Sequence, residues 1–304
     1  MGDIHQLLLE FGKDGVLKST GNRQVVEAAA GFLAAEDGEV GFVYSGWAQA
    51  ALPHKRLPDA MPWEVTSGPV SLIVQPGLKK IADGPLVSVG VPYGSRARLI
   101  LIYLQSEALR TGSREIELGR SLRVWLGRLG IPIGGKSIAE VRDQCERISF
   151  CRMTFQITKG SRVGLMNQLI LDQAMFEEEV EGRPRLLETV KLSESFFAEL
   201  RRHPVPVTEA AIRQLANNSF ALDVYCWLAY RLHALKTPLM VSWPALHAQF
   251  GRGFTQLKNF KPKFRTAVDL ALAVYPEAKL DMRERGVTLH PSRAPVEKTL
   301  ALAK

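Results

Sequence analysis

The sequence predicts an α+β, mostly helical protein in which two stretches repeat one order of elements. One stretch, residues 219–292, has the pattern of a helix, a short strand, two helices and a hairpin, and residues 96–171 repeat this order. The composition is that of a globular protein, 46% hydrophobic and 23% charged. Its 304 residues suffice for two domains. We expect an N-terminal extension over residues 1–85, a first domain over 86–180, a second over 190–292 and a C-terminal tail over 293–304.

The C-terminal half carries the clearest pattern. A helix is expected from Ser219 to Leu235, and an apolar run over 239–241 leads into a helix that begins at Ser242 and ends at Gly251. A hairpin closing on Gly286 is expected further on. Between them, a second helix has apolar residues at intervals of three and four, on one face: Phe254, Leu257, Phe260 or Phe264, and Val268. This is the element order of a winged helix-turn-helix, whose second helix normally enters the DNA major groove.

The second helix of this half is basic. Residues 251–265 contain five cations and no carboxylate. Lys258, Lys261 and Arg265 are spaced three and four apart, so they share a face that a phosphate backbone would bind by releasing counterions. The alternative is an ordinary solvated helix packed by its phenylalanines. Pro262 either kinks this helix or marks its true start.

We therefore expect a DNA-binding surface in this half. Most of its side chains would contact phosphates and fix the register, while Asn259 and Arg265 could read base edges. The candidate residues are Arg252, Lys258, Asn259, Lys261, Lys263, Arg265, Arg283 and Arg285.

The preceding half has a similar pattern. We expect a helix from Arg96 to Glu107, a strand from Glu115 to Leu118, and a β-hairpin around Gly160 that pairs Ser149–Thr158 with Val163–Leu171. Two amphipathic helices are expected between that strand and the hairpin, Ser121–Leu129 and Ser137–Ile148. The acidic stretch from Glu177 to Pro184 is the expected join between the domains. Before residue 85, the clearest element is a helix from Asn22 to Ala35, with Asn22 as its cap.

Residues 130–137, GIPIGGKS, match the phosphate-binding P-loop pattern G-x-x-x-x-G-K-[ST]. A P-loop requires a buried strand leading into it. Here the lead-in SLRVWLGRL repeats at helical spacing, so we expect a glycine-rich turn between two helices. Lys136, Ser137 and Arg142 would then lie near DNA phosphates. The alternative, a nucleotide hydrolase built around Lys136, predicts ATP turnover that Lys136→Ala abolishes.

The overall charge favours a polyanionic partner, since 39 Lys and Arg against 31 Asp and Glu give a net charge of +8 and a pI near 9.5. The three cysteines form no CxxC pair, and the six histidines show no metal-ligand spacing. We therefore expect no metal, no cofactor and no catalytic chemistry. No apolar run reaches the ~18 residues of a membrane span. The N-terminus shows no secretion signal, and a cytoplasmic location is expected.

Several separated blocks, in order, resemble the plasmid-encoded RepA family of replication initiators. They include GVPYGSRARLILIYLQSEALRTGSREIELGRSL, QFGRGFTQLKNFKPKF, AVYPEAKL and GVTLHPS, and the resemblance covers Val89 to Ser292. It implies a protein of two winged helices that binds repeated sequences (iterons) at a plasmid origin, helps to open the duplex, and brings in the host initiator and the replicative helicase. The helix over 255–272 would be the main base-reading element, and the helix over 137–148 would make a weaker contact.

The resemblance also implies a homodimer, because dimers of related initiators often repress their own gene while monomers start replication. The closest alternative within the same binding class is a transcriptional repressor without a replication role. Tandem binding sites, as opposed to a single inverted site, would favour the initiator.

Overall fold

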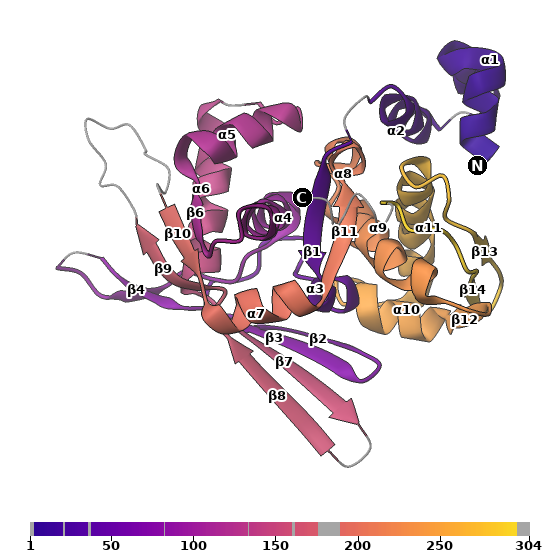
Figure 1. The fold of residues 1–304 in the computed structure, drawn as a ribbon. Coiled ribbons are helices and arrows are strands. Elements are labelled where there is room, and N and C mark those ends of the chain that lie inside the picture. The colour runs from indigo at the N-terminus through magenta and orange to yellow at the C-terminus, as the bar shows by residue number, and fades with distance from the viewer. Residues whose placement is uncertain are drawn as a thin grey trace. The chain divides into compact units, whose positions relative to one another are not determined.

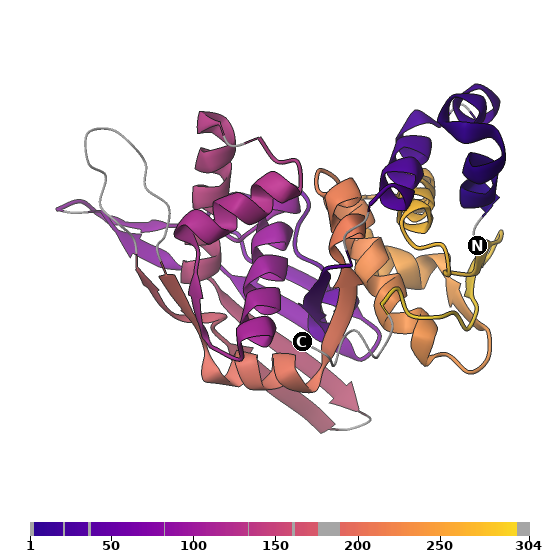
Figure 2. The same cartoon turned by 45° about the horizontal axis from the view of Figure 1, so that its top comes forward.

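The computed structural model describes residues 3–20, 22–35, 38–81, 83–132, 134–159, 162–175 and 189–296. Helices and several small sheets are distributed along the chain (Figure 1 and Figure 2), which confirms the expected mixture of α and β structure. The chain divides into two compact units. Unit 1 contains residues 1–41 and 205–304, and unit 2 contains residues 42–204. The expected N-terminal extension is thus divided between the units at Gly41.

Unit 1 contains the elements expected at the C-terminal end of the chain. They are α9 (Ser219–Arg231), β12 (Leu239–Ser242), α10 (Trp243–Phe250), α11 (Leu257–Ala273), β13 (Leu280–Met282) and β14 (Gly286–Leu289). The strands form an antiparallel sheet in the order β12–β14–β13. Glycine is needed at position 286, because a Cβ there would lie 2.1 Å from the Val241 carbonyl oxygen of the neighbouring strand. The close approach of β14 to β12 therefore depends on Gly286.

Helices from the start of the chain complete unit 1. They are α1 (Asp3–Thr20) and α2 (Arg23–Leu33), which join α8 (Glu209–Leu215) and the short helix η1 (Leu232–Ala234). The expected cap of α2 is present, since the side chain of Asn22 accepts a hydrogen bond from the Val25 amide. α2 packs against α11, and the His5 ring hydrogen-bonds the Ala273 carbonyl at 2.9 Å. Residues near both ends of the chain thus build one core.

An aromatic cluster fixes the position of α11. Phe260 and Phe264 are fully buried, with ring centres 5.3 Å apart. The Phe220 ring of α9 lies 6.2 Å from Phe260 and 6.0 Å from Phe264. Phe250 at the end of α10 lies 5.5 Å from Phe264. Buried aromatic side chains contribute large apolar areas, so this face of α11 is held on the inside of the unit.

Pro262 lies inside α11. The helix begins at Leu257 and continues across Pro262 to Ala273, so the proline does not mark its start. Proline lacks the amide that would bond the carbonyl four residues earlier, here that of Lys258. Pro262 is exposed, which places this defect on the solvent side of the helix.

Unit 2 also contains the helices and strands expected between residues 96 and 171. They are α4 (Gly94–Thr111), β6 (Glu115–Glu117), α5 (Gly119–Arg128), α6 (Gly135–Phe150), β7 (Arg152–Lys159) and β8 (Arg162–Gln168). Before them, residues 63–88 form β2 (Trp63–Ser67), β3 (Val70–Gln75), β4 (Leu78–Lys80) and β5 (Leu86–Ser88). The remaining elements of this unit include α3 (Ser45–Gln49), β9 (Leu171–Met175), β10 (Thr189–Leu192) and α7 (Glu194–Arg202). The two boundaries between the units along the chain fall within β1 (Val40–Tyr44) and β11 (Pro204–Thr208).

The strands of unit 2 pair over long distances in the sequence. The expected hairpin is present as β7–β8, and it extends β2 and β3 in a sheet ordered β2–β3–β7–β8. β6 pairs with β10, which also pairs with β9, in the order β6–β10–β9. The expected join at 177–184 lies outside the described residues. The strands on either side of it pair with each other, so both belong to one sheet of unit 2.

Candidate nucleic-acid interface

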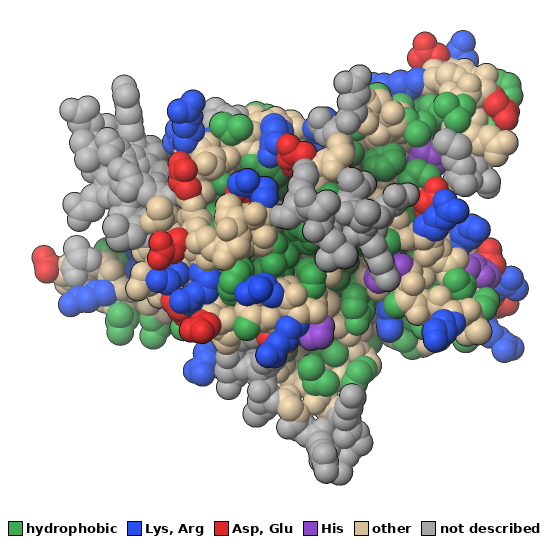
Figure 3. Space-filling model, in the orientation of Figure 1, with side chains coloured by type: hydrophobic (Ala, Val, Ile, Leu, Met, Phe, Trp, Pro, Cys, Tyr) green, Lys and Arg blue, Asp and Glu red, His purple; other side chains and the backbone are tan. Residues whose placement is uncertain are grey.

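The two faces of α11 differ in chemistry. Phe260, Phe264, Ala267 and Val268 are buried. The opposite face carries most of the polar candidates, since Lys258, Asn259, Lys263 and Arg265 are exposed and Lys261 is half-buried. The separation of apolar and basic residues expected from the sequence is therefore present. Figure 3 shows Lys and Arg side chains on the visible face of unit 1, over the region of α11 and the β12–β14 sheet.

Trp243, the first residue of α10, connects α11 to the hairpin β13–β14. The Lys261 ammonium lies 5.3 Å from the centre of its ring and the Arg265 guanidinium 5.9 Å. Its indole N–H donates to the Arg283 carbonyl at 3.2 Å, and its backbone N–H donates to the Arg285 carbonyl at 3.2 Å. Trp243 is 2% exposed, so packing fixes the conformation of its side chain. Trp243 thus contacts two cations of α11 and the backbone of the hairpin.

The hairpin contributes two further candidate cations. Arg283 forms an ion pair with Asp281 at 3.3 Å, and His290 hydrogen-bonds the same carboxylate at 3.0 Å. The hydrogen bonds from His290 and then Arg283 hold the pKa of Asp281 below its ordinary value. Arg285 is exposed. Arg283 is therefore partly neutralised by its neighbour on the same hairpin.

The turn between α10 and α11 is held by His247. Its Nε2 hydrogen-bonds the Phe254 carbonyl at 2.9 Å, and its ring lies 5.2 Å from that of Phe260. Position 251 requires glycine, because a Cβ there would lie 2.4 Å from the His247 ring. Arg252, the remaining candidate of this half, is exposed within the turn.

Few carboxylates accompany the basic face of α11. Within the described part of the chain, no ion pair at 4.0 Å or less joins a carboxylate to Lys258, Lys261, Lys263 or Arg265. Asp269 lies one turn beyond Arg265. Burial raises the pKa of Asp269 and Arg265 partly opposes this shift. The cations of α11 are therefore available to an anionic partner.

The candidates in unit 2 lie on a helix of mixed charge. Lys136 is exposed at the start of α6, and Ser137 and Arg142 are half-buried. The acidic residues of α6 are paired: Glu140 lies 3.5 Å from Arg96, Glu146 pairs with Lys79, and Asp143 lies 3.0 Å from Arg147. The structure thus places Lys136 and Arg142 among carboxylates on the same helix.

The segment 130–137 connects α5 to α6, as the sequence predicts. Gly130 adopts a left-handed conformation with φ of 71° and ends α5, and α6 begins at Gly135. The strand that must precede a P-loop is replaced here by a helix. A helix therefore comes both before and after this segment.

Sequence reasoning predicted α5, as the helix Ser121–Leu129, but missed its basic face. On α5, Arg120, Arg123 and Arg128 are exposed, whereas Leu122, Trp125 and Leu126 are buried. The signal is present in the sequence, because residues 118–139 contain four cations and no carboxylate. We expected the second helix of each half to contact DNA, and therefore did not consider the cations of α5, the first helix of its pair.

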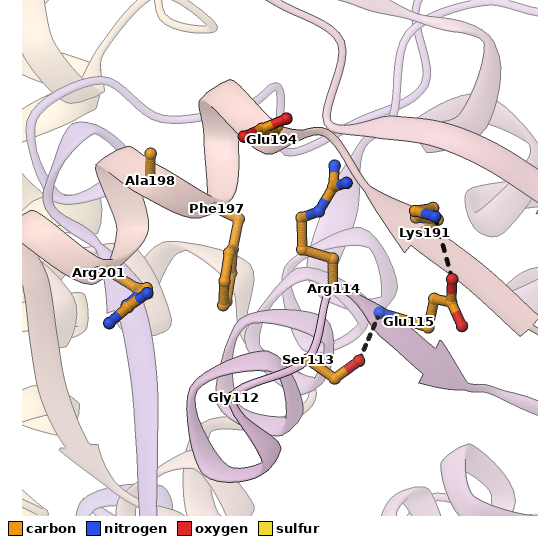
Figure 4. A pocket seen from close by; sticks show the side chains of 9 residues that line it. All are labelled: Gly112, Ser113, Arg114, Glu115, Lys191, Glu194, Phe197, Ala198 and Arg201. Atoms are coloured by element: carbon orange, nitrogen blue, oxygen red, sulfur yellow. Dashed lines mark hydrogen bonds and ion pairs between the residues drawn. The ribbon is translucent and has the colours of Figure 1, made fainter.

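A pocket of about 550 Å³ lies between the end of α4 and α7 (Figure 4). Its cations are largely balanced by neighbouring acids. Arg114 lies 3.3 Å from Asp172, and Lys191 lies 3.0 Å from Glu115. Arg201 lies over the Phe197 ring at 5.8 Å. With Glu194 also lining it, the pocket has no clear excess of positive charge.

Neither a metal cluster nor a membrane-spanning helix is found among the described residues. No group of three or more His, Cys, Asp or Glu side chains among them is arranged to hold a metal ion. In the same part of the chain, no helix combines the length and the apolar character that crossing a membrane requires.

Comparison with known families decides the affiliation of the chain. The model of the family described as plasmid encoded RepA protein matches residues 91–243, which is half of the chain. The chain belongs to the plasmid-encoded RepA family. This affiliation confirms the resemblance noted in the sequence and supports a role in replication initiation. The match ends at Trp243, so α11 lies beyond it and its assignment rests on its own geometry.

Solved structures extend the comparison. The crystal structure of selenomethionine derivatives of domains 2 and 3 of RctB is similar, with a TM-score of 0.53 and 13% identity, over 84% of this chain and 99% of that chain. A second structure of RctB domains 2–3 gives a TM-score of 0.47 and 13% identity, over 80% and 94% of the two chains. At this identity the first likeness concerns the fold alone. No protein with a curated description matches the sequence.

Proposed function

We propose that this RepA family member is a plasmid replication initiator that binds repeated duplex sequences at its origin through two winged helix-turn-helix domains, one in each unit. The proposal includes opening of the duplex and recruitment of a host initiator and helicase. It includes no covalent chemistry by the chain itself. A homodimer that represses its own gene is part of the same proposal.

The order of strands supports the winged-helix assignment. In unit 1, α9 precedes β12, α10, α11, β13 and β14, and the sheet is ordered β12–β14–β13. In unit 2, α4 precedes β6, α5 and α6, and the sheet is ordered β6–β10–β9. In both sheets the strand before the helix pair is next to the last strand. If the units are equivalent, β7 and β8 are an insertion between α6 and β9.

The observation that carries the proposal is the arrangement of α11. Its basic face is exposed, its opposite face is fixed by the aromatic cluster, and Trp243 holds Lys261 and Arg265 beside the hairpin. A helix with these properties can enter the major groove while cations on the adjacent hairpin contact the backbone. The preordered cations would release counterions from the phosphates. Asn259, exposed in the first turn of α11, has the amide that suits adenine.

Selection of duplexes from a random library, followed by footprinting on plasmid DNA, tests the proposal. We expect selected sequences to recur as tandem copies in the plasmid that encodes the protein, separated by multiples of about one helical turn. A single inverted site at the promoter would favour a repressor without a replication role. Failure to enrich any sequence would contradict the proposal.

A further inference from the structure

The basic charge of the two helix pairs lies on different helices. In unit 1, α10 contains no Lys, Arg, Asp or Glu, and the cations are on α11. In unit 2 the order is reversed, because α5 (GRSLRVWLGR) has three arginines and no carboxylate, while α6 carries both signs of charge. The element that would meet a polyanion in unit 2 is therefore α5.

α5 presents a defined cationic surface, which consists of Arg120, Arg123, Val124 and Gly127. Arg120 and Arg123 are one turn apart, and both are exposed, as are Val124 and Gly127. The buried side of α5 is anchored by Trp125, whose ring lies 5.4 Å from that of Tyr103 on α4. Gly127 leaves the last turn of the surface without a side chain, so a bound chain can approach the helix backbone closely there.

The two arginines also lack the acidic partners found on α6. In the described ranges, no ion pair at 4.0 Å or less involves Arg120 or Arg123. α6, by contrast, carries the carboxylates Glu140, Asp143 and Glu146, and its Arg147 pairs with Asp143. Arginine binds phosphate through a planar fork of N–H donors. The chemistry of this surface is thus complementary to a row of phosphates.

We propose that the α5 surface is a phosphate-binding site of unit 2 for the backbone of duplex DNA, with Arg120 and Arg123 as its principal contacts. This inference rests on the proposed function and replaces α6 by α5 as the main contact of this unit. It assigns base reading to α11 and a sequence-independent contact to α5. Duplex DNA is favoured over a protein partner because the surface combines a glycine and two cations without acidic partners among the described residues, with Val124 as its one apolar side chain.

The test is the salt dependence of DNA binding by the full chain. Removing one phosphate contact lowers the slope of log affinity against log salt by about one unit. We expect Arg120→Ala/Arg123→Ala to lower the slope by about two units on a random-sequence duplex and on a duplex enriched by selection, since each arginine would contact one phosphate. The ratio of the two affinities should stay unchanged, because phosphate contacts carry no sequence information.

Matched variants make the result decisive. Arg110→Ala/Arg202→Ala removes the same charge from two exposed helix positions of unit 2 that pair with carboxylates, and it should keep the wild-type slope. Arg120→Lys/Arg123→Lys should also keep the slope. A wild-type slope in Arg120→Ala/Arg123→Ala, or a loss of sequence discrimination, would overturn the inference. If the wild-type protein binds neither duplex, the proposed function itself fails.

Discussion

The Lys261 ammonium lies over the face of the Trp243 ring, 5.3 Å from its centre. Arg265 approaches the same ring, and the indole N–H is bonded to the Arg283 carbonyl of the hairpin. The face of an aromatic ring attracts cations. Trp243 therefore joins the core of unit 1 to the basic surface of α11, and a change at this buried residue should affect both stability and DNA binding.

Replacing Trp243 tests its role as a platform. Trp243→Phe and Trp243→Leu both lose the hydrogen bond to Arg283, but the phenylalanine variant keeps an aromatic ring. Each cation over a ring is worth about 0.5–1 kcal/mol at exposed sites, so we expect the leucine variant to bind DNA more weakly than the phenylalanine variant. Fluorescence anisotropy measures the DNA affinity of each variant. A urea titration gives the folded fraction, by which the affinity is corrected. Equal affinities would show that the ring does not position the cations.

Phe264 should be essential for stability. It is fully buried and contacts the rings of Phe250 and Phe260. Truncating such a residue leaves a cavity, so Phe264→Ala should lower the free energy of unfolding by about 3–5 kcal/mol. Phe11 is the matched control, because it is 63% exposed and Phe11→Ala should change stability by less than about 0.5 kcal/mol. Similar losses of stability in Phe264→Ala and Phe11→Ala would contradict the position of Phe264 in the core.

Pro262 should reduce the stability of α11. Proline in a helix interior is about 3 kcal/mol less favourable than alanine, partly offset by about 0.4–1 kcal/mol from its more restricted unfolded chain. We expect Pro262→Ala to raise the free energy of unfolding by about 2 kcal/mol, measured by urea denaturation. A variant less stable than the wild type would show that the proline is needed by the fold.

The thiols of Cys145 and Cys151 should be protected in the native state. Burial raises the pKa of each to about 12, from an ordinary value of 9.0. Near pH 8 we expect a thiol reagent to label them only as the protein unfolds. The pKa of each thiol is higher in the folded state than in the unfolded state. The contribution of the two thiols to the stability of the native protein is therefore fully present below pH 9, and it is lost as the pH rises towards 12.

Cys145→Ala/Cys151→Ala gives the control for that pH dependence. The double variant should lose less stability than the wild type between pH 9 and 12, compared by denaturation at each pH. Rapid labelling of Cys145 or Cys151 in the native wild-type protein near pH 8 would contradict the buried positions of these two thiols.

Local sequence patterns predicted the elements around α11 well. The cap at Ser242, the end at Gly251 and the phenylalanine spacing are signals that neighbours in sequence provide. The division of α11 into an apolar and a basic face was predicted from that spacing. The position of Trp243 under Lys261 was not predicted, because it depends on how the first residue of α10 packs against a helix that starts fourteen positions later.

Strand partners that lie far apart in the sequence were not predictable in the same way. Ser149–Thr158 has the alternation of a strand, but nothing local indicates that Leu72 lies opposite Phe155 or that Ile116 lies opposite Val190. The hydrogen bond from His5 to the Ala273 carbonyl likewise joins residues 268 positions apart. Pairing over such distances is decided by the packing of the whole unit, since many registers satisfy the same alternation.

The salt dependence of DNA binding by single α11 variants tests the central claim most directly. Lys258→Ala and Arg265→Ala should each lower the slope of log affinity against log salt by about one unit on a selected duplex. Lys13→Ala, an equal change of charge on α1, should keep the wild-type slope. Slopes equal to that of the wild type in both α11 variants would contradict the assignment of α11 as the DNA-binding helix.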